Sequence, residues 1–233
     1  MAKLWFVPVH DTDLTLSSAV EDYAKAIYAL QERSASAVST NALAERIGVT
    51  PASASSMVKK LDAMGLVAHE PYRGVTLTDA GVKVALEVIR HHRLLELYLT
   101  ETLGVPWDRV HDEAEVLEHV LSAELEELIA AQLGDPAYDP HGDPIPTRDG
   151  RMPEVATVSL QSLDTGTCGT FVRISDSDPE MLRYLAERGI APGAAFEVID
   201  KHPFDGPLFA RFGDEVHVLG GALTRAMRVE VDA

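Results

Sequence analysis

The stretch that decides the fold is STNALAERIGVTPASASSMVKKLDAMG, residues 39–65. Its apolar residues recur at helical spacing on both sides of Gly48, a residue type that commonly ends a helix in left-handed geometry. Thr50 and Pro51 then supply a hydroxyl N-cap and a proline for the first turn of the next helix, where no N–H is needed. A helix over 39–47, a turn of about three residues and a second helix ending near Met64 have the spacing of a helix-turn-helix.

The flanking residues extend this motif into a winged helix. Residues 15–33 repeat apolar side chains at helical spacing and predict a helix before the motif. After it, residues 66–70 and 75–77 are short strand-like runs around the turn 71–74, and together they predict a wing. A long helix opens at residues 78–81. The order helix, helix, helix, hairpin and helix predicts an N-terminal winged helix-turn-helix over residues 1–81.

Residues 82–133 are predicted to form a helical domain. Helical periodicity runs through them with one interruption near residues 103–106, so we expect two long helices. Two isolated helices cannot bury all of the apolar side chains in this segment, and the surplus predicts a homodimer. Those side chains are Leu94, Leu95, Leu97, Leu99, Val116, Leu117, Val120, Leu121, Leu125, Leu128 and Ile129.

The last 100 residues begin with a segment that is rich in proline. Residues 134–153 hold five prolines, which exclude a helix and predict a linker. Residues 154–233 then predict a small β-barrel with one helix around Pro179–Arg188. Its strand-like runs are 155–160, 169–174, 195–199, 207–212, 215–219 and 226–231. The fold class is therefore mainly α with a small β domain.

The net charge of −17 at first argues against a nucleic-acid partner, because an acidic protein repels phosphate at long range. The charge is unevenly distributed, however. Residues 1–81 hold 7 basic and 9 acidic side chains, whereas residues 82–153 hold 6 and 15. A DNA-binding domain joined to an acidic, cation-binding module would show this distribution, although a solvated acidic helix surface is the simpler alternative.

The chain shows neither an apolar run of about 18 residues nor a signal peptide, so we expect no membrane partner and no secretion. A single cysteine, Cys168, can form no internal disulfide and is typical of a reducing compartment. We therefore expect a cytoplasmic protein.

Residues 111–119, HDEAEVLEH, carry the chemistry. On a helix the side chains of His111, Glu115, Glu118 and His119 fall along one stripe. A further pair on the preceding helix has the same spacing and can face that stripe if the helices pack antiparallel; it consists of His92 and Glu96. Asp, Glu and His without cysteine suit divalent ions such as Mn²⁺, Fe²⁺ or Zn²⁺.

Other interpretations of these histidines stay open at this point. Glu and His four residues apart are also common on solvated helices, and His91 with Glu87 is a rival to His92, which we prefer. The remaining histidines have no acidic partner at helical spacing and are assigned to the surface or to loops. They are His10, His69, His141, His202 and His217.

A hydrolytic metal centre is a second interpretation of the stripe, but the sequence holds no H-E-x-x-H. It also lacks the second carboxylate and histidine motif of a di-iron bundle. We therefore predict that the protein is not an enzyme. A third interpretation is an acidic metal store in which the winged helix serves protein contacts.

Three motifs in order resemble those of the diphtheria toxin repressor family, which includes iron-dependent and manganese-dependent regulators. They are H-R-L-L-E at 92–96, V-H-D-E-A-E-V-L-E-H at 110–119 and P-H-G-D-P-I-P at 140–146, all after a winged helix. The resemblance covers nearly the whole chain. It implies a DNA-binding domain, a dimerisation and metal-binding domain over 82–133 and an SH3-like domain over 154–233. It also implies a repressor of metal-uptake genes that binds a palindromic operator in double-stranded DNA, without an organic cofactor.

The resemblance also implies two ions per chain. The primary site would take Asp22, Glu115, Glu118 and His119. The ancillary site would take His92, Glu96 and His111, with help from the C-terminal domain, for which the candidates are Asp176, Asp178 and Glu180.

Acids at positions 22 and 115 match the manganese-responsive branch of the family, whereas the iron-responsive branch has methionine and cysteine there. Oxygen ligands also favour Mn²⁺ on chemical grounds, and Fe²⁺ is the alternative. Lys25 departs from the manganese branch, which offers a further carboxylate there. Because a protonated lysine cannot bind a cation, two separated sites are expected instead of a binuclear one.

The candidate DNA contacts lie on the second helix of the helix-turn-helix and on the wing. Small side chains and hydroxyls can approach bases, and basic side chains can bind phosphate. They are Thr50, Ala52, Ser53, Ser56, Lys59, Lys60 and Arg73. An ion that joins Asp22 to the dimerisation helices would select the dimer spacing that fits two successive major grooves.

Overall fold

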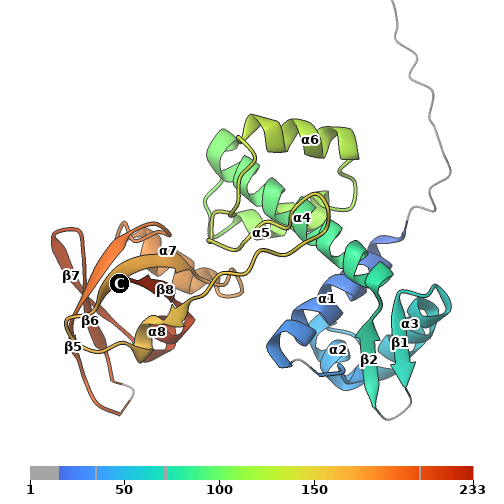
Figure 1. Ribbon diagram of the computed structural model, residues 1–233, viewed down its shortest axis with the longest axis horizontal. Coiled ribbons are helices and arrows are strands. Elements are labelled where there is room, and N and C mark those ends of the chain that lie inside the picture. Colours follow the sequence, from blue (N-terminus) through green and yellow to red (C-terminus); the bar gives the residue numbers. More distant parts are fainter. Residues whose placement is uncertain (1–15, 35, 71–72, 205, 233) are drawn as a thin grey trace, which may run out of the picture. The chain divides into compact units, whose positions relative to one another are not determined.

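The computed structural model describes residues 16–34, 36–70, 73–204 and 206–232 (Figure 1). The chain divides into two compact units, Met1–Ala85 and Leu86–Ala233. Helix α4, Asp79–Leu103, begins in the first unit and continues into the second. Among the described helices, none combines the length and the apolar character that crossing a membrane requires.

The N-terminal unit is a winged helix-turn-helix, which confirms the prediction. Helices α1 (Ser18–Ser34), α2 (Thr40–Ile47) and α3 (Pro51–Ala63) precede an antiparallel hairpin of β1 (Val67–Glu70) and β2 (Gly74–Leu77). Figure 1 shows the hairpin beside the three helices. The core between them consists mainly of aliphatic side chains, among them Val20, Ile27, Leu43, Val58, Leu61 and Val75.

Local capping groups set the boundaries of the helix-turn-helix. The Ser39 hydroxyl accepts the Ala42 N–H at the start of α2, and the Thr50 hydroxyl accepts the Ser53 N–H at 3.2 Å at the start of α3. Between them Gly48 ends α2 with φ of 75°, a conformation that L side chains disfavour. The roles of Gly48 and Thr50 were predicted, whereas Ser39 was expected as the first helical residue and is the N-cap instead.

The helical part of the second unit holds three helices where two were expected. After α4 come α5 (Val110–Leu117) and α6 (Ala123–Gln132). The predicted second helix breaks because the chain turns at residues 118–120 and Ser122 starts α6, its hydroxyl accepting the Leu125 N–H at 3.3 Å. The stripe of metal-ligand candidates therefore continues from the end of a helix into a turn.

The proline-rich segment, residues 134–153, forms no helix and packs against α4. Ile145 is buried in the core of the helical part. Arg90 Nη1 donates to the Pro146 carbonyl at 2.8 Å, and Arg93 Nη1 donates to the Pro144 carbonyl at 2.5 Å. Proline has no N–H to donate but keeps its carbonyl oxygen. Each of these two arginines therefore holds the segment by donating to a proline carbonyl.

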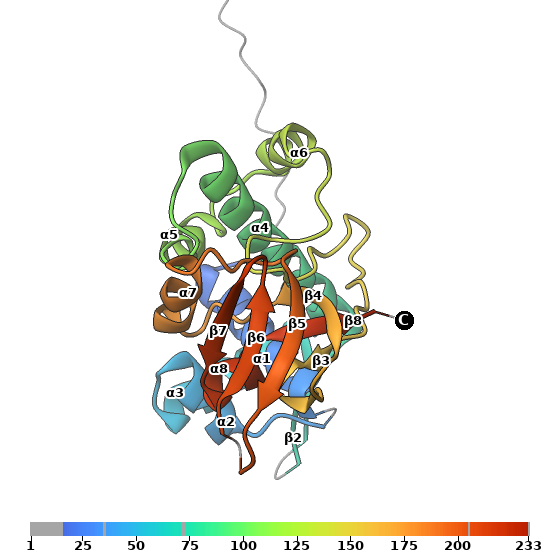
Figure 2. The same ribbon diagram turned by 90° about the vertical axis from the view of Figure 1, so that its left-hand side faces the viewer.

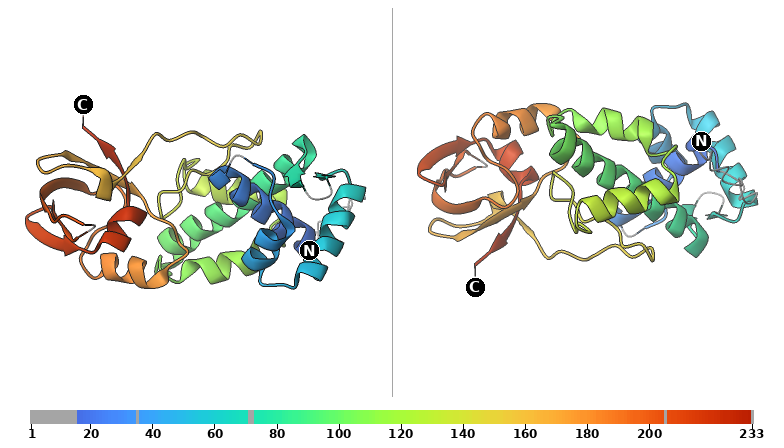
Figure 3. Two further views of the ribbon diagram at one scale, coloured as in Figure 1. Left: turned by 90° about the horizontal axis from the view of Figure 1, so that it is seen from below. Right: turned by 90° about the horizontal axis from the view of Figure 1, so that it is seen from above.

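The C-terminal domain is built on a six-stranded antiparallel sheet in the order β3-β8-β4-β5-β6-β7 (Figure 2). Its strands are β3 (Val158–Ser159), β4 (Cys168–Arg173), β5 (Ala195–Lys201), β6 (Leu208–Phe212), β7 (Glu215–Leu219) and β8 (Arg228–Val231). Register shifts in β4 and β5 bend the sheet. Figure 3 shows these orange and red strands curving together. The domain confirms the predicted SH3-like fold.

Short helices complete this domain. The 3-10 helix η1 (Leu160–Ser162) follows β3, and α7 (Pro179–Ala186) matches the one helix that was expected. Helix α8 (Gly221–Ala226) was not predicted, because it is only six residues long and begins with glycine. The buried face of the sheet and α7 share a core that includes Phe171, Ile174, Leu182, Leu185, Leu208 and Val229.

Candidate metal centre

His92 is buried at the centre of the candidate site, on α4. Its Nδ1 atom lies 2.5 Å from Glu118 Oε2, and its Nε2 atom lies 3.0 Å from Glu96 Oε1 and 3.1 Å from His111 Nδ1. The structure therefore brings residues of α4 and α5 together, as the predicted packing of these helices requires. His91, the rival candidate, instead faces Glu126, with its Nε2 3.3 Å from Oε2.

Asp176 extends this group from the C-terminal domain. Its Oδ2 atom lies 2.9 Å from His111 Nδ1, which is also 3.6 Å from Glu96 Oε1. His92, Glu96, His111 and Asp176 each offer an atom within 4.8 Å of the others. Atoms bound to one ion at about 2.0–2.2 Å lie about 3 Å from each other, so this spacing suits a shared cation.

The charges in this group are strongly coupled. Burial alone would raise the pKa of Glu96, but the nearby imidazoles of His111, His141 and His92 outweigh it and lower that pKa. The hydrogen bond to Asp176 and the nearby carboxylate of Glu96 raise the pKa of His111 to about 10. Burial raises the pKa of Asp176, but the hydrogen bond from His111 outweighs this effect and lowers that pKa. A metal ion would therefore have to displace a proton from His111.

The residues expected in the primary site lie in both units. Glu118 is buried at the end of α5, and His119 follows it, with its Nε2 3.7 Å from Glu118 Oε1. Glu115 is half-exposed on α5, and its Oε1 lies 3.9 Å from His92 Nδ1. His92, Glu115 and Glu118 thus form a second group of potential ligands. Asp22 is half-buried on α1 of the N-terminal unit.

Two residues of the proline-rich segment, Asp139 and His141, also belong to the site and were not predicted as ligands. His141 was assigned to the surface or to a loop; it lies in a loop, but it is fully buried. Its Nδ1 atom lies 3.6 Å from Glu96 Oε2 and 3.9 Å from Asp139 Oδ1. Glu96, Asp139 and His141 form a third, completely buried group of potential ligands.

The backbone of this segment brings His141 and Asp139 into place. Asp139 Oδ1 accepts the N–H of His141 at 2.8 Å and the N–H of Asp143 at 2.9 Å. Gly142 has φ of 84°, and a Cβ there would lie 1.8 Å from the carbonyl oxygen of Val172. Only glycine allows this close approach of the segment to the C-terminal domain.

Burial makes the charged forms of the third group energetically unfavourable. It raises the pKa of Asp139 to about 8, with repulsion from Asp143 and Glu96 acting in the same direction. It lowers the pKa of His141, but Glu96 and Asp139 outweigh it and raise that pKa to about 9. The Nδ1 atom of His141 is buried and makes no hydrogen bond within the described structure. A divalent cation would satisfy that atom and the carboxylates together.

Asp178 and Glu180, which were predicted as ligands, lie at the start of α7. Asp178 caps α7, with its Oδ1 accepting the N–H of Glu180 at 3.1 Å and that of Met181 at 3.2 Å. Glu180 is exposed on the first turn of α7. Within the described part of the chain, neither residue belongs to a group of potential ligands, whereas Asp176 does.

The predicted DNA contacts are exposed on α3 and on the wing. They are Thr50, Ala52, Ser53, Ser56, Lys59, Lys60 and Arg73. The hydroxyls of Thr50 and Ser53 lie 2.9 Å apart and bond to each other. Arg73 Nη1 lies 3.3 Å from Glu70 Oε2, at a side chain that is 81% exposed. An exposed pair of this kind is weak, so the guanidinium can exchange it for phosphate.

The helical part of the second unit exposes an apolar surface around α5 and α6. Val116 and Val120 are 71% and 75% exposed, and Leu125 and Leu128 are exposed as well. These four were among the side chains expected in excess of what the chain can bury. The remaining leucines of that set on α4 are buried within the chain. Several large aliphatic side chains exposed on neighbouring helices are consistent with a protein interface.

Three family models match successive parts of the chain. They are described as "Iron dependent repressor, N-terminal DNA binding domain" for residues 15–75, "Iron dependent repressor, metal binding and dimerisation domain" for residues 78–147 and "FeoA domain" for residues 158–231. The diphtheria toxin repressor of Corynebacterium jeikeium is 34% identical over 168 residues, which cover 70% of each chain. The chain belongs to the diphtheria toxin repressor family.

Two further comparisons cover most of the chain. The iron-dependent repressor IdeR of Mycobacterium tuberculosis is 29% identical over 227 residues, 92% of this chain and 98% of that protein. The structure of a manganese-dependent transcriptional repressor in complex with manganese is 44% identical. Its TM-score is 0.83, and the match covers 91% of this chain and 100% of the other. Membership of this family makes the protein a metal-dependent transcriptional repressor and not an enzyme, and its domains imply operator DNA and a homodimer as partners.

Proposed function

We propose that the protein represses transcription when Mn²⁺ binds and that it regulates genes of metal uptake. The observation that supports this most strongly is the group of His92, Glu96, His111 and Asp176, with donor atoms at distances that suit one cation. Oxygen and imidazole ligands without sulfur favour Mn²⁺ over softer ions. Cys168 is exposed and lies in none of the ligand groups found among the described residues.

We further propose two ions per chain, held mainly by residues that the sequence singled out. The primary ion would bind Glu118, His119 and Glu115, with Asp22 as the ligand from α1. The ancillary ion would bind at Glu96. Its ligands would come from His92, His111, Asp176, Asp139 and His141. His92 belongs to two of the groups, and one imidazole nitrogen binds one ion, so the overlap of the groups supports two ions instead of three.

Lys25 supports separate sites instead of a binuclear one. It follows Asp22 by three residues on α1, so both side chains lie on neighbouring positions of one helix face. A protonated amine offers no lone pair to a cation and repels it. The primary site of this chain would therefore hold one ion.

The bound cation supplies positive charge and a fixed coordination geometry. Asp22 belongs to the DNA-binding domain, whereas Glu118 and His119 belong to the metal-binding domain. Carboxylates that share one cation are held at one separation, and without it they repel one another. We propose that this difference sets the spacing of the two α3 helices in the dimer and so their fit to a palindromic operator. The protein would act in the cytoplasm, where such operators are reached.

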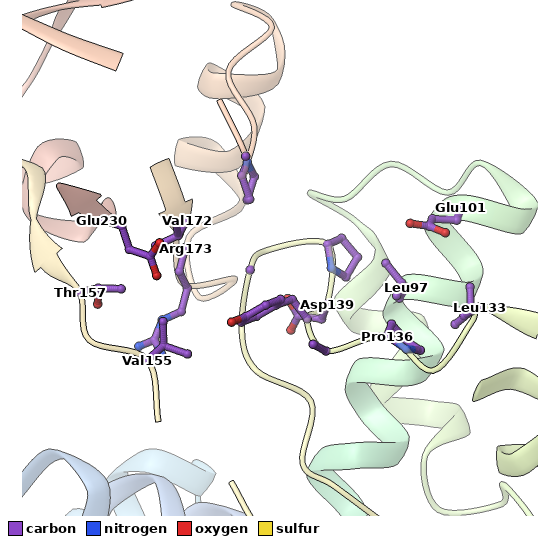
Figure 4. A pocket seen from close by; sticks show the side chains of 16 residues that line it. Leu97, Glu101, Leu133, Pro136, Asp139, Val155, Thr157, Val172, Arg173 and Glu230 are labelled. Carbon is purple, nitrogen blue, oxygen red and sulfur yellow. The ribbon is translucent and has the colours of Figure 1, made fainter. Parts of the chain in front are cut away.

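A cavity beside the ancillary ligands offers a route for the ion. Its volume is about 540 Å³, and Asp139 is among the residues that line it. Figure 4 shows Leu97, Glu101 and Asp139 on one side of it and Thr157, Arg173 and Glu230 on the other. The acidic side chains at its rim would attract a divalent cation towards Asp139.

Two roles are proposed for the exposed side chains of α3 and the wing. Lys59, Lys60 and Arg73 would bind phosphate, and Arg73 would first release Glu70. The side chains that would approach bases are Thr50, Ala52, Ser53 and Ser56. The mutual hydrogen bond of Thr50 and Ser53 makes Ser56 the freer hydroxyl of the set.

A DNA-binding titration under anaerobic conditions tests the choice of metal. The full-length protein and Asp22→Met are titrated with Mn²⁺ and with Fe²⁺ in the presence of an operator fragment that the protein has selected from genomic DNA. We expect Mn²⁺ to activate the wild type at lower free concentration than Fe²⁺, and Asp22→Met to lose that preference. Equal activation of the wild type by both ions would contradict the manganese proposal.

Iron is the second candidate, and a specific comparison favours it. The relative IdeR is named as iron-dependent, and its match covers 92% of this chain and 98% of that protein. Activation by Fe²⁺ at lower concentration than Mn²⁺ in the same titration would establish this alternative.

A further inference from the structure

One ring nitrogen of His141 faces away from the potential ligands and makes a hydrogen bond. Its Nε2 atom lies 2.8 Å from the carbonyl oxygen of Trp107, in the loop between α4 and α5. A carbonyl can only accept, so Nε2 carries a hydrogen and donates it. The other ring nitrogen, Nδ1, is then the one that can bind a cation, and it is directed towards Glu96 and Asp139.

The side chain of Trp107 fixes the plane of the same ring. The indole stacks on the imidazole of His141, with ring centroids 5.7 Å apart and planes inclined by 16°. The indole is also partly buried against the core of the C-terminal domain. Trp107 therefore contacts a potential ligand and the β domain at once.

Neighbouring contacts hold the loop and the segment in the same arrangement. Asp108 Oδ2 lies 3.2 Å from Arg183 Nε on α7. The Ile174 N–H, just after β4, donates to the carbonyl of His141 at 3.0 Å. The backbone of His141 is thus fixed from the β domain, and its ring from the loop.

We propose that Trp107 is a positioning residue that selects Nδ1 of His141 as the ligand atom and couples that atom to the docking of the C-terminal domain. This inference rests on the proposed metal site at Glu96, Asp139 and His141. Groups that hold the second nitrogen of a metal-binding histidine fix its tautomer and its orientation, and their loss typically weakens metal binding about 10- to 100-fold. Trp107 holds both the nitrogen, through its carbonyl, and the ring plane, through its indole.

Four substitutions in the full-length protein test this role. Trp107→Phe keeps an aromatic ring for stacking, whereas Trp107→Leu keeps apolar bulk and loses the stack. Asp108→Asn is the matched control, because it weakens the contact with Arg183 in the same loop and leaves the stack on His141 in place. His141→Ala reports the loss of the site itself.

Two measurements are made on each variant. Calorimetric titration with Mn²⁺ gives the affinity and number of ions. Long-range ¹⁵N–¹H NMR of the metal-free protein at pH 10, above the His141 pKa of about 9, shows which nitrogen of the neutral ring carries the hydrogen. We expect Trp107→Leu to weaken one ion by about 10- to 100-fold, because the indole no longer fixes the ring plane of His141, while the backbone carbonyl that accepts from Nε2 remains. Trp107→Phe should change the affinity less than Trp107→Leu, and Asp108→Asn should bind both ions as the wild type does.

The outcomes separate this role from the proposed site. If His141→Ala loses one ion while Trp107→Leu binds both with wild-type affinity, or if the neutral ring of the wild type carries its hydrogen on Nδ1, the role of Trp107 is wrong and the site stands. If His141→Ala binds Mn²⁺ as the wild type does, the site is wrong and the inference falls with it. Circular dichroism confirms that each variant is folded, and the comparison of Phe with Leu decides the question even if one of them is destabilised.

Discussion

His111 Nδ1, on α5, lies 2.9 Å from Oδ2 of Asp176, which follows β4 in the C-terminal domain. The two residues are far apart in sequence, and their contact connects the metal-binding helices to the β domain. The same nitrogen lies within 3.1 Å of His92 Nε2. A cation that replaces the proton between His111 and Asp176 would therefore be bound by residues of both domains.

Removing the charge of Asp176 should lower the pKa of His111. The Asp176→Asn substitution keeps the size of the side chain and removes the carboxylate that contributes most to the raised pKa of about 10. NMR titration of the metal-free variant should show His111 losing its proton at lower pH than in the wild type. Asp178→Asn is the control, since Asp178 caps α7, and an unchanged pKa of His111 in Asp176→Asn would refute the contact.

The substitution Gly142→Ala should destabilise the protein by about 3 kcal/mol, because the new methyl group would clash with the Val172 carbonyl and the residue would keep a left-handed conformation. Gly134→Ala is the matched control. Gly134 has φ of 75°, but a Cβ there meets nothing within 4 Å, so only the backbone cost of about 1–2 kcal/mol applies. Urea unfolding measures both, and equal losses would show that the close approach at Gly142 has no energetic weight.

A charge on the exposed apolar surface should weaken the dimer. Val120 is 75% exposed, so Val120→Glu costs little in the folded monomer but places an unpaired carboxylate in the expected interface. Sedimentation equilibrium should show the dimer dissociation constant rising at least about tenfold. Val216→Glu, on β7 of the C-terminal domain, should leave it unchanged. A dimer that tolerates Val120→Glu as well would have another interface.

Stability in acid should depend on Glu126. A hydrogen bond from His91, with Arg90 acting in the same direction, lowers the pKa of Glu126 from 4.5 to about 2. A lowered carboxyl pKa stabilises the folded state above the unfolded value and loses that effect as the pH falls towards 2. The free energy of unfolding should therefore fall less between pH 4.5 and 2 in Glu126→Gln than in the wild type. Identical pH dependence of the two proteins in chemical denaturation would contradict the pairing.

The winged helix could be predicted because its signals are local. Ser39, Gly48 and Thr50 act on residues within a few positions, and each has the capping role in the structure that its residue type predicts. The break after α5 also has a local signal, since Ser122 is an N-cap, but the uninterrupted apolar periodicity concealed it. Periodicity shows which residues are helical more reliably than it shows where one helix ends.

The candidate site was only partly predictable, for a physical reason. His92, Glu96 and His111 follow helical spacing, whereas His141 meets Glu96 through a tertiary contact between α4 and the proline-rich segment. Spacing contains no information on such contacts. Asp176 and Asp178 are the same residue type two positions apart, so the sequence does not distinguish them as ligands. In the fold, Asp176 faces His111 and Asp178 caps α7.

The most direct test of the central claim is the affinity of the full-length protein for operator DNA with Mn²⁺ and after chelation. Fluorescence anisotropy at constant ionic strength, with a labelled palindromic fragment selected by the protein from genomic DNA, gives both dissociation constants. Metal-gated repression predicts that chelation weakens binding at least about a hundredfold and that added Mn²⁺ restores it. The same affinity with and without metal would contradict the account.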